Sequence, residues 1–508
     1  MMNTDRRLKA ASVALMVGIL SPVHTVASTP SGSAPPTPLA CEAMPQDYLD
    51  GLLENPKLQR SHWGVLVQPL TAASDQITPP PKPWLSHNAE QFFNPASNAK
   101  LLTTAAVLTR LGRYHYVNTA LVLEPSSQSP PSLRIHTIGN PALNQAALDH
   151  FADAVKQKSL TAVDTVWVDA EDIGLVREGR ISSWEWGDLP FGYGSPASTA
   201  IFNNNQLTLT LTGTEPGQAP QMDFSDPIAA QQWVIHNQVI TDDNAPAQIT
   251  FTPGWPNILL LTGTLPPGET NKTVLAVPNP PQYLGDAFKY TLEQQGISVA
   301  QVRISRNARI QPSQGHSVLT SYSSPSSGDL VTTINRFSNN LYAEVLLGWL
   351  GIQSIAPNLK LPEERSRQVL EDALTQLNVE PTSHRVADGS GLSRQNLVTP
   401  QALVTVLNGM WRSPETLVFR QSLPIAGETG TLRDRFKDTV LEGRLIAKTG
   451  TLTGVSALSG YFPYEDQTWV AFSILVNHSN QPASVLRQAM DDLLVAIAET
   501  PRHCLVAN

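Results

Sequence analysis

The chain has 508 residues, with 34 lysines and arginines against 43 aspartates and glutamates, and its formal net charge at pH 7 is −9. This length allows about three domains with ample cores, and the acidic balance lacks the clustered cations of a nucleic-acid-binding protein. The 11 histidines form no H-E-x-x-H helix or comparable zinc set, and no G-x-S-x-G segment precedes a credible triad. We therefore expect no nucleic-acid partner, no metal and no other cofactor.

The first 27 residues have the pattern of a signal peptide. Cations at residues 6–9 precede an almost wholly apolar stretch at 10–20, and Thr25-Val26-Ala27 supplies the small residues of a cleavage site. The apolar stretch is too short for a good membrane span, and no other run of about twenty apolar residues follows. We expect export to the periplasm without stable membrane insertion, with secretion as the alternative. Residues 28–40, rich in proline and serine, are expected to be a disordered linker.

The two cysteines, Cys41 and Cys504, lie near the two ends of the mature chain. In an oxidising compartment this pattern favours one disulfide between them. Such a bond suits a protein whose two ends belong to one domain. Two free thiols remain the alternative.

The segment around Ser97 has the pattern of a nucleophile on a helix. Asn94-Pro95-Ala96 precedes it and a nearly continuous apolar stretch, 101–108, follows Lys100. We expect Ser97 to begin a buried helix, with the proline just inside its start. The three-residue spacing places both side chains on one face, where a free lysine amine can deprotonate the serine. Burial or a neighbouring cation, such as Lys448, would lower the lysine pKa. An ordinary core helix with a solvent-facing lysine is the alternative.

The central part of the chain alternates apolar and polar residues in the manner of strands. Examples are 165–169, 206–211 and 257–261, which proline- and glycine-bearing turns separate. The segment 282–295 is predicted to be helical. This region therefore differs in character from the apolar helical pattern that follows Lys100.

The motif Ser338-Asn339-Asn340 stands where a loop turns into an apolar helix. Both Ser338 and Asn340 can point into a cleft from such a place, and a second hydroxyl there can relay a proton to a leaving amine. The alternative is that Ser338 merely caps a helix that begins near Asn339.

The motif Lys448-Thr449-Gly450-Thr451 follows a short strand pattern at 444–447. Glycine lets another chain approach a strand closely, which fits a sheet edge that docks a peptide. Lys448 and the hydroxyls of Thr449 and Thr451 would hold a substrate carboxylate, and the backbone N–H groups of Ser97 and Thr451 would form an oxyanion hole. A solvated strand end is the alternative. Strands at 456–464 and 468–476 and a helix at 483–499 complete an α/β layered domain.

Together the three motifs, S-x-x-K, S-x-N and K-T-G in this order, resemble the D-alanyl-D-alanine carboxypeptidase/endopeptidase family, the class C low-molecular-mass penicillin-binding proteins. The similarity spans the chain from about Cys41 to the end. Four further stretches support it, namely 94–108, 388–394, 423–432 and 460–461.

The resemblance implies an α/β (α+β layered) catalytic domain of the penicillin-binding serine transpeptidase-like, β-lactamase-like kind, split by a large β-rich insertion of one or two domains. Ser97 and Ser338 are 338 − 97 = 241 positions apart, further than in a compact β-lactamase. We place the catalytic domain at 41–113 and 321–508 and the inserted domains at 114–320, with a β-rich module nested at about 200–275.

The resemblance also implies a function. We expect a serine-type D-Ala-D-Ala carboxypeptidase and/or DD-endopeptidase that acts on peptidoglycan stem peptides through an acyl-enzyme on Ser97 and is inhibited by β-lactams. Asp188 and Tyr193, in an aromatic loop at 184–193, would contact an amino group of the peptide, although packing of these aromatics between domains explains the loop equally well. A serine β-lactamase and a non-catalytic peptidoglycan-binding protein are the alternatives.

Overall fold

The computed structural model describes residues 41, 44–70, 81–124, 130–170, 181, 183–306, 317–352, 362–465 and 468–505. The predicted signal peptide and linker lie outside these residues. Among the described helices, none is both long and apolar enough to cross a membrane. Both cysteines are disulfide-bonded, as predicted, and Cys504 lies in α12 (Arg502–Leu505).

The catalytic sheet combines strands from both ends of the chain. Its five strands run in the order β16-β17-β18-β1-β2, so that β1 pairs with β18, far from it in sequence. The edge position of β16 agrees with the prediction for the K-T-G motif. The strands are β1 (His62–Pro69), β2 (Leu85–His87), β16 (Ile446–Leu452), β17 (Val455–Pro463) and β18 (Trp469–Asn477).

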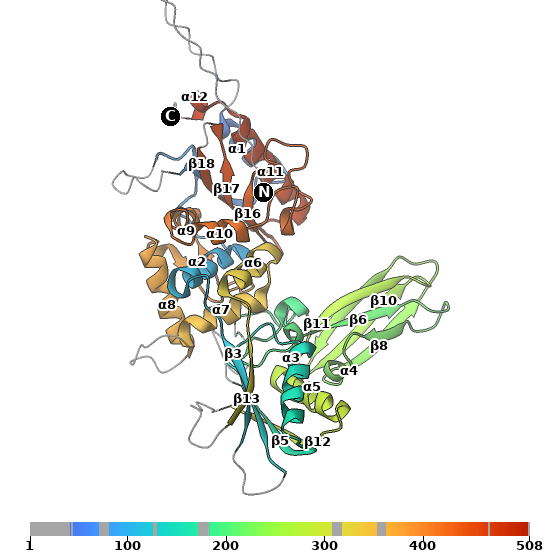
Figure 1. Ribbon diagram of the computed structural model, residues 1–508. Helices are drawn as coiled ribbons and strands as arrows, with labels where there is room; N and C mark the ends of the chain where they lie inside the picture. The colour runs from blue at the N-terminus through green and yellow to red at the C-terminus, as the bar shows by residue number, and fades with distance from the viewer. Residues whose placement is uncertain are drawn as a thin grey trace, which may run out of the picture. The chain divides into compact units, whose positions relative to one another are not determined.

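Helices cover both faces of this sheet, which is why β17 and β18 are buried along almost their whole length. On one face lie α1 (Pro45–Glu54) and α11 (Ala483–Glu499) (Figure 1). The other face packs on α9 (Pro400–Arg412) and, beyond it, on a layer of further helices. Each face has its own apolar core. The predicted layered α/β class is confirmed.

The helical layer is organised around α2 (Ala99–Leu111). Residues 99–108 of this helix are all buried, and α2 contacts each of the helices around it. A helix that is apolar on all sides is stable only when it is enclosed in this way. The surrounding helices are α6 (Ser327–Phe337), α7 (Asn340–Ile352), α8 (Pro362–Gln376), α9 and α10 (Thr416–Ser422).

The strands between the first two motifs form sheets of their own. A five-stranded sheet has the order β12-β5-β4-β3-β13, and two three-stranded sheets have the orders β11-β6-β7 and β8-β10-β9. A separate apolar core serves them, to which α3 (Gln145–Gln157), α4 (Pro227–Ala230) and α5 (Pro280–Gln294) contribute (Figure 1). The strands are β3 (Asn118–Leu123), β4 (Leu133–His136), β5 (Ala162–Asp169), β6 (Gln206–Thr212), β7 (Gln221–Phe224), β8 (Val234–Thr241), β9 (Gln248–Gly254), β10 (Ile258–Leu265), β11 (Thr270–Ala276), β12 (Ser298–Ser305) and β13 (Ser317–Ser323).

This arrangement confirms a catalytic domain split by a β-rich insertion. The predicted strands at 165–169, 206–211 and 257–261 fall in β5, β6 and β10, and the predicted helix at 282–295 is α5. The boundaries at 113/114 and 320/321 and the nested module at about 200–275 stay predictions.

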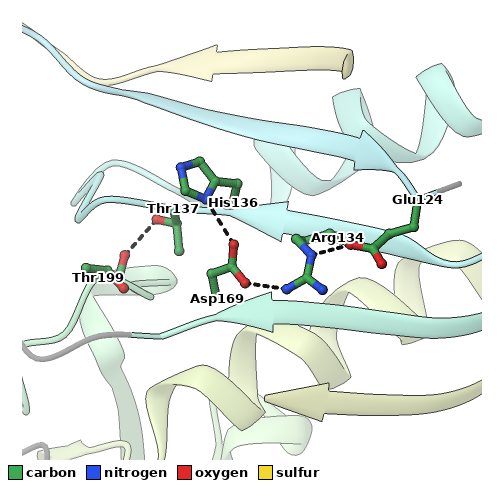
Figure 2. A network of polar contacts seen from close by, with 6 residues as sticks. All are labelled: Glu124, Arg134, His136, Thr137, Asp169 and Thr199. Carbon is green, nitrogen blue, oxygen red and sulfur yellow. Dashed lines mark hydrogen bonds and ion pairs between the residues drawn. The ribbon is translucent and has the colours of Figure 1, made fainter. Parts of the chain in front are cut away.

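A charged network lies across two neighbouring strands of the inserted five-stranded sheet (Figure 2). Arg134 on β4 is buried and pairs with Glu124 and, at 2.6 Å, with Asp169 on β5. The second oxygen of Asp169 lies 2.9 Å from Nδ1 of His136. A buried guanidinium is tolerated because carboxylates face it on both sides. Arg134, His136 and Asp169 lie on β4 and β5, so this network links neighbouring strands of the inserted sheet.

A buried hydrogen bond links β17 of the catalytic sheet to α9 of the helical layer, and its loss should be measurable. The buried hydroxyl of Tyr461 on β17 donates to the carbonyl oxygen of Leu407 on α9 at 2.7 Å. We expect Tyr461→Phe to lower the free energy of unfolding by about 1 kcal/mol, seen as a lower midpoint of thermal unfolding. Tyr48→Phe, which changes an exposed tyrosine of α1, is the control and should leave the midpoint unchanged. Equal midpoints for both variants would contradict this account.

Candidate active site

Ser97 lies in a single 3₁₀ turn, η1 (Ala96–Asn98), and α2 begins immediately after it at Ala99. The expectation that Ser97 begins the α-helix, with the proline inside its start, was therefore wrong in detail. Ala96 has a φ of 45°, a left-handed conformation that no α-helix accommodates, so Pro95 stays outside. The expected pairing still forms, because Nζ of Lys100 lies 2.9 Å from Oγ of Ser97. Ser97 is partly exposed and Lys100 is fully buried.

The three partners of Lys100 fix the direction of its lone pair. Nζ lies 2.6 Å from Oδ1 of Asn340 and 2.5 Å from the carbonyl oxygen of Ser390, in addition to Ser97. Both of these oxygens can only accept hydrogen bonds. A neutral amine has two hydrogens and one lone pair, so its hydrogens are used by the two acceptors and the lone pair faces the Ser97 hydroxyl. This is the geometry of a general base.

The orientation of Asn340 is itself fixed by the inserted region. Its Nδ2 donates to the backbone oxygen of Tyr193 at 2.8 Å, which turns Oδ1 toward Lys100. Tyr193 lies in the 3₁₀ turn η2 (Gly192–Gly194). A backbone group of the insertion therefore decides which atom of Asn340 faces the lysine.

Burial lowers the pKa of Lys100 to about 7, while the nearby carboxyl groups of Asp388 and Glu344 act in the opposite direction. The expectation of a depressed lysine pKa is met, with burial rather than the neighbouring cation as its main cause. Lys448 is also fully buried, and its pKa is held well below the usual range by burial and then by the charge of Lys100.

Ser338 stands at the end of one helix rather than at the start of the next. It ends α6 with a φ of 59°, and its Oγ accepts a hydrogen bond from Nζ of Lys448 at 3.0 Å. Asn339 supplies the capping contact for α7, because its Oδ1 accepts from the N–H of Tyr342 at 2.9 Å. The alternative that Ser338 caps this helix is therefore wrong. The turn brings Ser338 to Lys448 and Asn340 to Lys100.

Strand β16 lies directly against the turn that holds Ser97. A β carbon on Gly450 would come within 3.0 Å of the backbone nitrogen of Ser97, so only glycine allows this approach. Thr449 donates from Oγ1 to Oγ1 of Thr431 at 2.7 Å, and Thr451 is exposed. The K-T-G strand is thus placed where a peptide bound along it would reach Ser97.

Two buried carboxyl groups that sequence reasoning missed hold the loop behind Lys100. Glu344 on α7 is fully buried and accepts hydrogen bonds from the backbone N–H groups of Ser390, at 2.8 Å, and Gly389, at 3.1 Å. Asp388 accepts four more at 2.6–2.8 Å, from the backbone of Gly391 and Ser393 and the side chains of Asn396 and Trp184. This loop presents the Ser390 carbonyl to Lys100.

Burial, and then the charge of Asp388, raises the pKa of Glu344 to about 8. This shift favours the uncharged form of Glu344 at neutral pH. The sequence did contain a signal for it, because Glu344 is the one charged residue in the apolar helix at 340–352. A charge in such a helix is buried only with partners.

The aromatic loop at 184–193 reaches the site. Tyr193 donates from its hydroxyl to Oδ1 of Asp188 at 3.0 Å, and burial raises the pKa of this carboxyl group. Trp184 is buried and donates to Asp388 at 2.6 Å. The loop thus packs against the catalytic region through Trp184 while Tyr193 stays half exposed beside Asn340.

Comparison with solved structures shows the same fold. Penicillin binding protein 4 from Haemophilus influenzae is similar with a TM-score of 0.75 and 23% identity, over 89% of this chain and 99% of that chain. A structure of the same protein complexed with a β-lactam gives a TM-score of 0.70 and 21% identity over the same shares of 89% and 99%. These likenesses confirm the predicted penicillin-binding type of fold.

Sequence comparison gives the family. A D-alanyl-D-alanine carboxypeptidase from Actinomadura sp. is 29% identical over 486 residues, which cover 90% of this chain and 85% of the relative. Residues 46–497 match the D-Ala-D-Ala carboxypeptidase 3 (S13) family. This match covers most of the chain and agrees with the resemblance of the three motifs. The chain therefore belongs to the D-Ala-D-Ala carboxypeptidase 3 (S13) family.

Proposed function

We propose that Ser97 is the nucleophile through which this serine-type D-Ala-D-Ala carboxypeptidase, with endopeptidase activity on cross-linked peptides, acts on peptidoglycan stem peptides. The observation that carries this proposal is the 2.9 Å contact between Nζ of Lys100 and Oγ of Ser97, together with two acceptors that can bind both hydrogens of a neutral Lys100 amine. The leader at 1–27 supports a periplasmic location.

In the first step Lys100 removes the proton of Ser97, whose Oγ attacks the carbonyl carbon of the D-alanyl-D-alanine bond. The backbone N–H groups of Ser97 and Thr451 bind the oxyanion. The close approach of β16 at Gly450 supports this pairing, since it brings the two backbone segments together. Lys448, Thr449 and Thr451 hold the terminal carboxylate of the substrate.

In the second step the bond between the carbonyl carbon and the leaving amine breaks, and the amine takes a proton from Ser338. The contact from Nζ of Lys448 to Oγ of Ser338 supports this role, because the lysine can return the proton to Ser338. Water then attacks the acyl carbonyl carbon and gives a proton through Ser338 to Lys448. As the bond between the acyl carbon and Oγ of Ser97 breaks, Lys100 returns its proton to Ser97 and the shortened peptide acid is released. A cross-linked substrate differs only in its larger leaving amine.

Asp188 and Tyr193 bind an amino group of the stem peptide on the acyl side. Their mutual hydrogen bond at 3.0 Å and their link to Asn340 through the backbone oxygen of Tyr193 support this assignment. A partly buried carboxylate is destabilised when it is unpaired, and pairing with a cation offsets this cost.

Benzylpenicillin tests the nucleophile directly. Intact-mass measurement during incubation should show one adduct that persists for many minutes and that peptide mapping assigns to Ser97. Ser97→Ala should form none, whereas Ser86→Ala, on the exposed side of β2, should react normally. Rapid consumption of the drug without an adduct would instead mean a β-lactamase. If neither an adduct nor drug loss occurs, the protein is a binding protein and the mechanism is wrong.

The pH dependence of acylation tests Lys100. Because its folded-state pKa is about 7, the amine is free above this value and protonated below it. The acylation rate constant should rise with pH, reach half of its maximum near pH 7, and be roughly 100-fold below the plateau at pH 5. Stopped-flow measurement with a chromogenic β-lactam would show this. A rate that is constant from pH 5 to 8 would exclude Lys100 as the base.

Glu344→Gln tests whether the buried carboxyl group positions the base. The amide has one acceptor oxygen for two backbone N–H groups, so the Ser390 carbonyl should move away from Lys100. We expect the acylation rate constant to fall by about 5–30-fold, which corresponds to about 1–2 kcal/mol, while noncovalent binding of the β-lactam is unchanged.

The control for Glu344→Gln is Asp491→Asn, which disrupts another largely buried carboxylate, paired with Arg435 at 3.0 Å and remote from the motifs. It should lower the thermal midpoint without slowing acylation. Acylation at the normal rate by Glu344→Gln, or equal slowing in both variants, would contradict a positioning role.

A further inference from the structure

Two exposed tryptophans lie against each other in the inserted region. The chain has 10 tryptophans, all within the described residues, and only Trp186 and Trp255 are exposed, at 44% and 63%. Their ring centroids are 5.8 Å apart and their planes are inclined by 35°. Trp186 belongs to the aromatic loop at 184–193, and Trp255 to the turn between β9 and β10. Single exposed apolar residues are common, but such a pair from distant segments marks a binding surface.

The aromatic loop is held against the strands that carry Trp255. The N–H of Ala276 on β11 donates to the oxygen of Pro190 at 2.8 Å. The ring of Phe191 packs edge-on against the ring of Phe251 on β9, with centroids 6.0 Å apart. The two exposed tryptophans are therefore placed side by side by contacts of their own segments, before any ligand binds.

A small apolar cavity of about 60 Å³ is lined in part by Trp186. Its walls include Trp184 and Trp233, whose indole N–H groups donate to Asp388 at 2.6 Å and to the oxygen of Ala276 at 2.9 Å. These hydrogen bonds fix the two wall rings. One water molecule needs roughly 10–15 Å³ of such space. The cavity therefore admits a group of a few heavy atoms, whereas a whole sugar ring or a peptide does not fit.

Two residues that line this cavity carry polar groups without a hydrogen bond in the described part of the chain. They are the indole N–H of Trp186 and the side-chain amide of Asn257. The indole can only donate, and the amide can both donate and accept. A matching ligand has an apolar face for the rings, polar groups at its edge and a small substituent for the cavity.

An N-acetylated amino sugar has all three features. The C–H groups of its ring form an apolar face, its hydroxyl groups lie at the edge, and its acetamido group is small enough for the cavity. Peptidoglycan strands consist of such sugars and carry the stem peptides, so this choice of ligand rests on the proposed function. Trp186 is two positions from Asp188, to which we assign binding of the stem peptide.

The exposed area of the pair is too small for a stable protein partner. Two half-exposed tryptophan rings offer roughly 200 Å², whereas a stable interface covers about 800 Å² of each partner. One sugar ring, by contrast, matches the area of an indole face. A saccharide therefore fits the pair better than a second copy of the chain.

We propose that Trp186, Trp255 and the adjoining cavity bind an N-acetylated amino sugar of the glycan strand that carries the stem peptide. The sugar ring lies on the exposed tryptophan surface, and its acetamido group enters the cavity beside Asn257. Because aromatic contacts dominate this binding, loss of either exposed ring should weaken it by about 5–10-fold.

Isothermal titration calorimetry with two neutral trisaccharides tests the proposal. One consists of β-1,4-linked N-acetylglucosamine, and the other, of β-1,4-linked glucose, has hydroxyl groups in place of the acetamido groups. We expect the acetylated sugar to bind about 3–10-fold more tightly. Trp186→Ala and Trp255→Ala should each weaken its binding by about 5–10-fold. The control Tyr290→Ala, which removes an exposed ring of α5 outside the cavity wall, should bind normally.

Three results would overturn the proposal: no binding of either trisaccharide, equal binding of both, or binding that survives the loss of the tryptophans. Trp255→Phe guards against a folding defect, because it keeps an aromatic ring and should retain most of the binding. Analytical ultracentrifugation tests a second copy as the occupant. A dimer of the normal protein that Trp255→Ala cannot form would also overturn the sugar assignment.

The calorimetric test is independent of catalysis. Ser97→Ala should bind the acetylated trisaccharide as the normal protein does, since the sugar does not touch the serine. If the normal protein binds this sugar but neither reacts with benzylpenicillin nor consumes it, the proposed function fails and the sugar site stands. If the protein is acylated but binds no sugar, the proposed function stands and the sugar site fails.

Discussion

The active site depends on the burial of one lysine amine. A buried amine must have a partner for each hydrogen, and Lys100 meets this need with Asn340 and Ser390, which come from two distant segments. Each acceptor has its own support, Tyr193 for Asn340 and Glu344 for the Ser390 loop. When the two acceptors bind both hydrogens of the neutral amine, its lone pair points toward Ser97. This arrangement is the geometry that a general base requires.

The same network explains why an insertion can lie between the first two motifs without disturbing the chemistry. The inserted region returns to the site at the turn Gly192–Gly194, which fixes Asn340, and at β11, which packs on that turn. Backbone hydrogen bonds and the close packing of Gly192 hold this junction together. The insertion is therefore part of the site's construction, and its edge strand adds a wall to a cavity beside Ser338.

The sequence was sufficient wherever local spacing decides the structure. Ser97 and Lys100 are three positions apart and meet, and alternating or apolar stretches gave β5, β6, β10, α5 and α11 closely. The sequence was insufficient where contacts between residues far apart in the chain decide the local structure. Glu344 and Asp388 hold a loop whose Ser390 is 290 positions from Lys100 in the sequence.

The two buried lysines also explain the order of proton transfers in the proposed mechanism. Burial, and then the charge of Lys100, lowers the pKa of Lys448, and neither amine is exposed to water. Before acylation a neutral Lys100 places no charge beside Lys448. Once Lys100 has taken the proton of Ser97, its new charge makes the proton of Lys448 easier to lose. That proton can pass through Ser338 at 3.0 Å to the leaving amine, so uptake at one lysine drives release at the other.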